Sequence, residues 1–181
     1  MGFTFFSGPS SNFPPQSQWK SFVDIFNINK PLMFATGDTG EDVGRIFNAV
    51  NDAAKAIGVE ERVIFAIIMQ ESTGNVGVKT TFDKDGNATA GLMQVEGGPG
   101  FPGQHGLSQD QINSMVNAGT QHFKQNLIDF GNADNADTIF KALREYNSGS
   151  VNPNNLSEAP NGAGVSSYVS DIANRLLGRT P

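Results

Sequence analysis

Glu71 is the residue of this sequence best suited to acid–base chemistry, because it follows an apolar run from Val63 to Met69. At helical spacing this run is apolar on nearly every face, which predicts a buried central helix with Gln70 and Glu71 at its C-terminal end. Burial and the negative end of the helix dipole both disfavour the ionised carboxylate, so we expect a raised pKa for Glu71. Such a group can act as a general acid near neutral pH. The alternative is a helix-end glutamate that points into water.

No metal site and no cofactor are predicted. Oxygen-bearing side chains alternate from Asp83 to Asn87 as in a calcium loop, but Gln94 stands where that loop needs a glutamate and Ala88 where it needs a glycine. His105 follows a glycine-rich loop and His122 falls within a predicted helix, and neither has a second histidine at ligand spacing. We therefore expect both histidines to be structural or solvated.

Composition excludes several classes of function. The 12 Lys and Arg against 18 Asp and Glu give a net charge of −6, which lacks the basic field that nucleic acids and anionic membrane surfaces attract. The absence of cysteine excludes a disulfide framework, a thiol nucleophile and a thiolate metal site. No apolar stretch approaches the roughly 20 residues of a membrane helix. We expect a monomer with no nucleic-acid or membrane partner.

The residues at the amino terminus, Met1 to Phe6, have no basic region and no small-residue cleavage site, so they do not resemble a signal peptide. A low charged fraction of 17% and 21 glycines are typical of secreted proteins. We expect a secreted protein whose signal peptide has been removed. The sequons at Asn87 and Asn155 could carry glycans only on a eukaryotic secretory route.

The elements that must position Glu71 are mostly helices. A capping box at Thr39 to Asp42 opens a helix that continues to Gly58, and a small hairpin is expected over Gly77 to Thr89 with its Asp-Gly turn inside. The remaining helices are expected over Val59 to Glu71, Ser108 to about Phe130, Ala136 to Tyr146 and Val165 to Leu177. The predicted fold class is α+β, mostly helical with a short antiparallel hairpin.

Residues 1–40 are predicted to form a separate arm, because Phe alternates there with Pro, Gly, Ser and Asn. A short helix over Ser17 to Phe26 is the one regular element expected in it. Its aromatic residues are too many for a solvated linker, so the arm should pack on the domain of residues 41–181. They are Phe3, Phe5, Phe6, Phe13, Trp19, Phe22, Phe26 and Phe34.

Three motifs follow one another along the chain: Glu71-Ser72, the Ala-Gly-Leu-Met-Gln-Val segment of residues 90–95, and the Glu-Tyr-Asn-Ser-Gly segment of residues 145–149. In this order they resemble the lysozyme-like family of soluble lytic transglycosylases and goose-type lysozymes. That family has a Glu-Ser at a buried helix end, a Gly-Leu-Met-Gln strand and a Tyr-Asn-x-Gly turn. Ala118-Gly119-Thr120 is similar to a further helix of the family, and the resemblance extends from Val43 to Leu177.

The resemblance implies a lysozyme-like fold with a glycan cleft and assigns roles residue by residue. Glu71 matches the catalytic acid, and Tyr146 matches a tyrosine whose hydroxyl contacts that carboxyl group. The other matching positions support the acid, bind sugar or lie along the cleft as a strand. They are Ser72, Gly91, Leu92, Met93, Gln94 and Asn147.

Goose-type lysozymes are similar to this chain in two further acidic positions, which here are Asp85 and Glu96. In that reading Asp85 orients a water molecule as a base and Glu96 assists it. An inverting pair of carboxyl groups lies about 6.5 to 9.5 Å apart, with the attacking water between base and sugar. The alternatives are that Asp85 serves the Asp-Gly turn and that Glu96 is a solvated loop residue.

The sequence therefore predicts a glycoside hydrolase that cleaves the β-1,4 links between N-acetylmuramic acid and N-acetylglucosamine in peptidoglycan with inversion. One alternative on the same fold is a lytic transglycosylase, which needs only one carboxyl group and leaves 1,6-anhydromuramyl ends. Another is a chitinase, since an acidic protein is unusual on anionic cell walls. A non-catalytic glycan-binding module or a part of an envelope-penetrating machine belongs to a different class.

Overall fold

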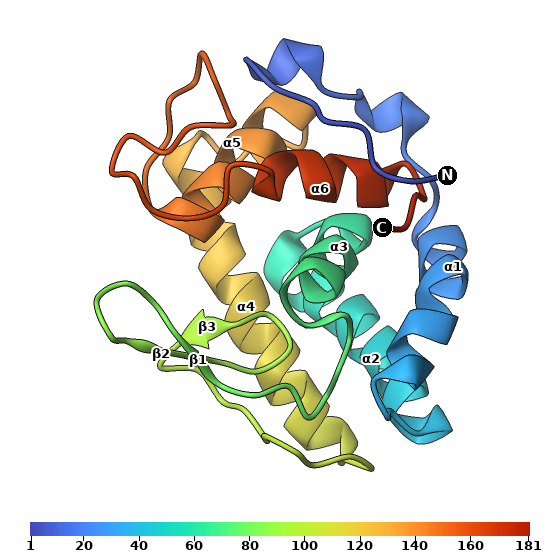
Figure 1. The fold of residues 1–181 in the computed structure, drawn as a ribbon. Coiled ribbons are helices and arrows are strands. Elements are labelled where there is room, and N and C mark those ends of the chain that lie inside the picture. Colours follow the sequence, from blue (N-terminus) through green and yellow to red (C-terminus); the bar gives the residue numbers. More distant parts are fainter. The chain divides into compact units, whose positions relative to one another are not determined.

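The structure, a computed structural model, describes residues 1–181 and consists of α-helices and one three-stranded antiparallel sheet (Figure 1). The helices are α1 Phe22–Ala35, α2 Gly40–Ala53, α3 Glu61–Ser72, α4 Gln109–Asp129, α5 Ala136–Ser148 and α6 Tyr168–Leu176. The strands are β1 Thr81–Phe82, β2 Ala88–Ala90 and β3 Val95–Glu96. The predicted α+β class, mostly helical, is confirmed. None of the helices combines the length and the hydropathy that crossing a membrane requires.

The chain divides into two compact units, and each is described by itself. Unit 1 contains Met1–Ser21 and Phe123–Pro181, and unit 2 contains Phe22–His122. Unit 2 therefore carries Glu71 and the sheet, whereas unit 1 carries Tyr146. The division into a 1–40 arm and a 41–181 domain stays a prediction.

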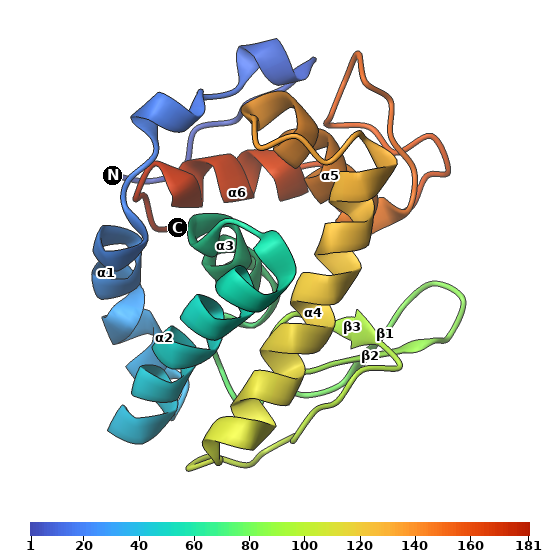
Figure 2. The same cartoon turned by 180° about the vertical axis from the view of Figure 1, so that it is seen from behind.

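The centre of unit 2 is α3, whose residues from Val63 to Met69 are buried, as the sequence predicts. This helix packs against α1 and α2, which lie beside it in both views (Figures 1 and 2). A cluster of rings joins the three helices: Phe22 and Phe26 of α1 have their centroids 5.1 to 5.8 Å from those of Phe47 and Phe65. Each such pair contributes about 0.5 to 1.5 kcal/mol beyond the area it buries.

Helix α1 corrects the sequence analysis, which expected an irregular arm with one short helix over Ser17 to Phe26. The structure instead has a helix of 14 residues that starts at Phe22 and continues through Pro31. Its buried residues recur at i, i+3, i+4, i+7 and i+11, which is one face of a helix. They are Phe22, Ile25, Phe26, Asn29 and Met33. Burial of this face against α2 and α3 outweighs the helix penalty of Pro31, about 3 kcal/mol.

The capping box at the start of α2 is confirmed. The Thr39 hydroxyl accepts a hydrogen bond from the Asp42 amide at 3.1 Å, and the Asp42 carboxylate accepts one from the Thr39 amide at 3.0 Å. Each bond satisfies an amide that the helix start would otherwise leave without a partner. The predicted extension to Gly58 is a π-helical turn, Ala54–Gly58, after α2.

In unit 1 the N-terminal segment runs along α6 (Figure 1). Its aromatic side chains pack on α5. Backbone amides of this segment donate to the Asn174 side chain at 2.9 Å and to the Ser170 hydroxyl at 2.8 Å. The buried rings of Phe13 and Trp19 lie 5.1 and 5.7 Å from that of Phe140. Helix α6 begins three residues later than the predicted start at Val165.

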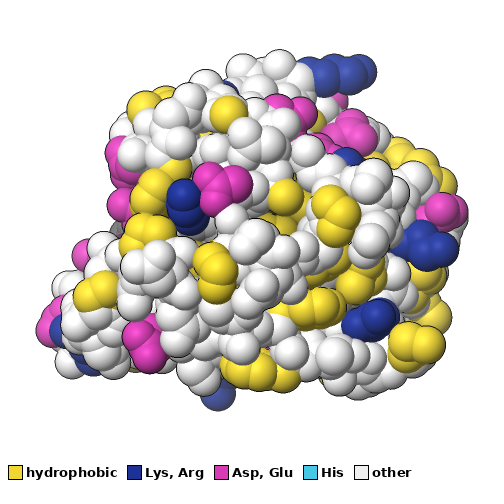
Figure 3. Space-filling view, turned by 90° about the horizontal axis from the view of Figure 1, so that it is seen from above, with side chains coloured by type: hydrophobic (Ala, Val, Ile, Leu, Met, Phe, Trp, Pro, Cys, Tyr) yellow, Lys and Arg dark blue, Asp and Glu magenta, His cyan; other side chains and the backbone are white.

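Charged side chains of both signs are interspersed on the face of the molecule shown in Figure 3. Neither sign forms a continuous patch on this face. Single apolar side chains are exposed at Phe5, Phe34 and Phe82, which is normal for a protein surface.

Candidate functional site

Glu71 lies in the last turn of α3 and is half-buried, so the predicted helix-end position is confirmed. The helix ends at Thr73, which adopts a left-handed conformation with φ 56° and donates to the Met69 carbonyl at 3.1 Å. Gly74 continues in the left-handed region at φ 71°, and a Cβ there would lie 2.5 Å from Cγ of Met33. The backbone therefore turns sharply at Thr73 and Gly74, shortly after Glu71.

Ser72 joins the end of α3 to the segment of the second motif. Its side chain is buried, and its hydroxyl lies 3.0 Å from the Ile68 carbonyl and 2.8 Å from the Leu92 carbonyl. A hydrogen bond to Leu92 attaches the turn of the helix that carries Glu71 to a distant part of unit 2. Ser72 thus acts as a support at this end of α3.

Residues 91–94 form a tight turn between β2 and β3, which corrects the prediction of a strand. The Gln94 amide donates to the Gly91 carbonyl at 3.0 Å, and both residues have positive φ, 49° and 78°. In a strand, consecutive side chains point to opposite faces. Here Leu92 and Met93 are both fully buried, and the turn makes that geometry possible.

Two glycines allow this turn to pack closely on its surroundings. A Cβ at Gly91 would lie 2.4 Å from the Pro99 carbonyl oxygen, and a Cβ at Gly119 of α4 would lie 2.4 Å from Cβ of Met93. Because their side chains are inaccessible, Leu92 and Met93 could reach a sugar only through their backbone. Their side chains anchor the turn in the core.

One face of the sheet carries a polar row, which we define as Thr81, Thr89, Gln94 and Glu96. Thr81 pairs with Thr89, and Thr89 pairs with Glu96, so the three strands present these three side chains on the same face. Gln94, in the turn before β3, joins them through its hydrogen bond to Thr81. The Thr81 hydroxyl lies 2.7 Å from the Thr89 hydroxyl and donates to Oε1 of Gln94 at 2.7 Å. Hydroxyl and amide groups of this kind can exchange hydrogen bonds with sugar hydroxyls.

The sequence analysis predicted Gln94 and Glu96 as site residues but missed Thr81 and Thr89. The signal that could have found them is their place in the β-branched runs on either side of the Asp-Gly turn. Residues directly opposite in an antiparallel pair lie on one face. The sequence pattern did not give the register of the hairpin, which is what pairs Thr81 with Thr89.

Asp85 lies in the turn between β1 and β2, with its side chain 66% exposed and one carboxylate oxygen 3.7 Å from Nζ of Lys84. The turn itself is held by Asp83, whose Oδ1 accepts from the amides of Asp85 and Asn87, both at 2.9 Å. Hydrogen bonds from Asn87 lower the pKa of Asp83, and the hydrogen bond from the Asp85 amide adds a smaller effect in the same direction. The structural role considered for Asp85 therefore belongs to Asp83.

Glu96 is exposed in β3, and its charge acts on His122 of α4. Burial lowers the pKa of His122, and the carboxylate of Glu96 opposes this shift. The sequence analysis predicted no partner for either residue. The polar row therefore has a titratable imidazole near its Glu96 end.

In unit 1, Tyr146 is half-buried in α5, and its ring meets that of Phe123 edge-on with centroids 6.1 Å apart. The helix continues to Ser148, two residues beyond the predicted end at Tyr146, and Gly149 caps it with φ 72°. The predicted Tyr-Asn-x-Gly turn is thus the last turn of a helix. Tyr146 and Glu71 belong to different units, so a contact between them stays a prediction.

Asn147 holds the loop that follows α5. Its Oδ1 accepts from the Val165 amide at 2.7 Å and from the Arg144 guanidinium. The role implied by the family resemblance, that Asn147 supports the acid or binds sugar, stays a prediction. The contacts show that its carbonyl oxygen already has two donors.

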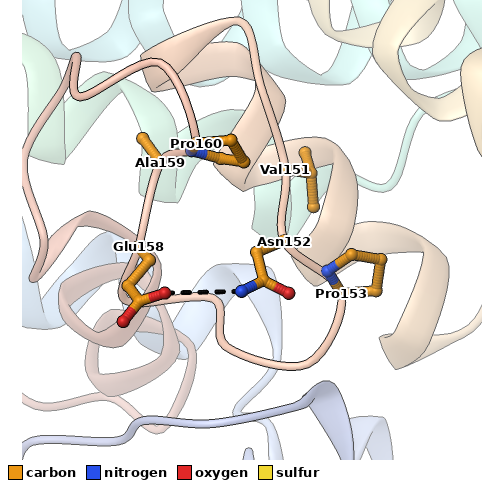
Figure 4. Close-up of a pocket in the computed structure, with 6 residues that line it drawn as sticks. All are labelled: Val151, Asn152, Pro153, Glu158, Ala159 and Pro160. Carbon is orange, nitrogen blue, oxygen red and sulfur yellow. Dashed lines mark hydrogen bonds between the residues drawn. The ribbon is translucent and has the colours of Figure 1, made fainter.

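The same loop encloses a hollow of about 560 Å³, which Figure 4 shows in close-up. Within it the Asn152 amide donates to the Glu158 carboxylate at 3.4 Å. The lining residues are Val151, Asn152, Pro153, Glu158, Ala159 and Pro160. None of the predicted site residues is among them.

Residues 48–164 match the family model described as the transglycosylase SLT domain, which includes all three motifs. The chain belongs to the SLT family. The membership confirms the lysozyme-like resemblance and supports a peptidoglycan-cleaving enzyme of that superfamily. No curated protein matches this chain.

Proposed function

We propose that this SLT chain is a secreted muramidase that hydrolyses β-1,4 links of peptidoglycan with inversion at the anomeric carbon. Glu71 is the general acid, and Asp85, assisted by Glu96, is the base that activates water. The observation that carries the proposal is the hydrogen bond from the Ser72 hydroxyl to Leu92. It ties the end of α3 to the turn that joins β2 to β3, the strand that carries Glu96.

The reaction needs two proton transfers. Glu71 protonates the glycosidic oxygen as the bond to the leaving sugar breaks, while the base takes a proton from the water that attacks the opposite face of the ring. The transition state resembles an oxocarbenium ion, with positive charge developing on the sugar ring. The side chains of the polar row supply hydrogen-bonding groups for the sugar hydroxyls.

Two contacts support Asp85 and Glu96 as the second carboxyl groups. Asp83 makes the hydrogen bonds of the turn, which leaves the Asp85 carboxylate outside them. Glu96 is exposed in β3 and pairs with Thr89 of the polar row.

The second candidate function is a lytic transglycosylase, and the family description favours it. In that reaction Glu71 alone protonates the glycosidic oxygen and then, as a base, assists the muramyl 6-hydroxyl in attacking its own anomeric carbon. The product carries a 1,6-anhydro ring and no water is consumed. A third candidate is cleavage of chitin. A protein with a net charge of −6 is repelled by an anionic cell wall but not by uncharged chitin.

Product analysis separates these functions. With purified peptidoglycan we expect reducing ends, formed first as the α-anomer, because water arrives from the face opposite the leaving group. Mass spectrometry detects the added water, and early NMR spectra identify the anomer. Predominant 1,6-anhydro ends would establish the transglycosylase, and cleavage of chitin oligomers alone would establish the third candidate.

Replacing Asp85 with Asn should lower the hydrolysis rate about 100-fold or more, because an amide cannot accept the proton from water. Glu96→Gln should have a smaller effect, since it removes only the assisting group. Asp52→Asn, at an exposed aspartate of α2, is the matched control and should retain the wild-type rate. An Asp85→Asn enzyme with full hydrolytic activity would rule out this base.

Tyr146→Phe should lower kcat about 10-fold without unfolding the chain. The family resemblance predicts that its hydroxyl contacts the Glu71 carboxyl, and a hydrogen bond to an ionisable group contributes about 1.5 to 3 kcal/mol. Steady-state kinetics and circular dichroism measure the two effects. Tyr168→Phe, the same change at the other tyrosine, should leave kcat unchanged; equal kcat values for both variants would contradict the role of Tyr146.

A further inference from the structure

Three side chains of unit 2 that the proposed reaction does not use converge at one point. Asp38, Asp42 and His105 each offer a ligand atom, and these atoms lie within 4.8 Å of one another. Nδ1 of His105 is 3.2 Å from Oδ1 of Asp38. The residues come from the turn after α1, the first turn of α2 and the loop before α4, so the cluster joins three separate segments.

Asp42 is a fixed negative charge in this cluster. It is fully buried, and its carboxylate accepts hydrogen bonds from the amides of Thr39, Gly106 and Leu107 at 3.0, 2.8 and 2.9 Å. Burial opposes the charge, but the hydrogen bonds from Gly106, Thr39 and Leu107 outweigh it and lower the pKa of Asp42. Asp42 therefore brings an ionised carboxylate into the interior.

The buried carboxylate of Asp38 is only partly hydrogen-bonded. Its side chain is fully buried; Oδ1 accepts from the Val76 amide at 3.1 Å and faces His105, but Oδ2 is buried without any hydrogen-bond partner. A buried carboxylate oxygen with no partner is costly, so native proteins satisfy such atoms with a donor or a cation. The unpartnered oxygen indicates a positively charged ligand at this position.

His105 supplies both access and a nitrogen ligand. Its side chain is 28% exposed, which connects the cluster to solvent. Gly37, whose φ of 103° favours glycine, packs beside the imidazole: a Cβ there would lie 3.4 Å from Nε2 of His105, in ordinary contact. One imidazole nitrogen and two carboxylates are a ligand set that suits Zn²⁺, with water completing the tetrahedron, better than Ca²⁺ or Mg²⁺.

We propose that Asp38, Asp42 and His105 bind a divalent transition-metal ion, best matched by Zn²⁺, which cross-links three segments of unit 2. The ion satisfies Oδ2 of Asp38 and holds the loop before α4 to the start of α2. Its role is stability of unit 2, and the cleavage reaction proceeds without it. The competing occupant is a proton, because burial, with a contribution from the Asp42 charge, raises the pKa of Asp38 to about 6.

The test titrates the full chain, stripped with EDTA, with zinc chloride alone in an isothermal calorimeter at neutral pH. We expect one saturable site. At a zinc concentration about 100 times the Kd, the melting temperature should rise by about 5 to 10 °C. Absence of saturable binding, or binding without a rise in melting temperature, would overturn the proposal.

Variants assign the site. His105→Gln changes a partly exposed side chain and should weaken zinc binding about 100-fold while the circular dichroism spectrum stays that of the wild type. His122→Gln removes the only other histidine and should bind zinc as the wild type does. Asp38→Asn should also lose zinc binding. Equal affinity of His105→Gln and the wild type, or loss of binding in His122→Gln, would place zinc elsewhere and refute the site.

Discussion

Replacing Glu71 with Gln should abolish cleavage of peptidoglycan, with a rate reduced at least about 1,000-fold. The amide keeps the size and much of the hydrogen bonding of the carboxyl group, but it cannot protonate the glycosidic oxygen. Glycan binding and the melting temperature should stay close to those of the wild type. Turnover of purified peptidoglycan, with pull-down on the same material, measures activity and binding separately.

Glu61→Gln is the matched control for this variant, since it makes the same change in the first turn of α3. It should retain activity. If Glu71→Gln cleaves as fast as the wild type, Glu71 is not the acid. If the wild type itself binds glycan without cleaving it, the chain is a glycan-binding module.

Replacing Gly119 with Ala should destabilise the protein by about 2 to 3 kcal/mol, although alanine is the better helix former. The added Cβ would lie 2.4 Å from both Cβ and Sδ of Met93. Cβ of Met93 is fixed to the backbone of the 91–94 turn, so the turn itself has to move. Because Ser72 ties that turn to the end of α3, activity should fall together with stability.

Gly44→Ala is the control, because Gly44 is an exposed glycine inside α2 and nothing lies within 4 Å of its added Cβ. This change should stabilise the chain by about 0.5 to 1 kcal/mol. Chemical denaturation of both variants gives the two free energies of unfolding. A Gly119→Ala protein as stable as Gly44→Ala would show that the turn is not packed against α4 as described.

The sequence by itself determined the features that depend on local chemistry. The capping box at Thr39, the buried helix before Glu71 and the Asp-Gly hairpin were predictable, because each rests on hydrogen bonds or periodicity within a few residues. The three motifs were also sufficient to predict the SLT family and the position of Glu71 at a helix end.

Only the tertiary structure decided the features that depend on distant neighbours. Helix α1 forms despite Pro31 because its apolar face is buried against α2 and α3. Residues 91–94 form a turn because Leu92 and Met93 both find space in the core, beside the glycine at position 119. Likewise, strand register brings Thr81 and Thr89 to Gln94 and Glu96, and loop closure brings His105 to Asp38. Pairings between residues far apart in the chain depend on packing, and local sequence patterns do not encode packing.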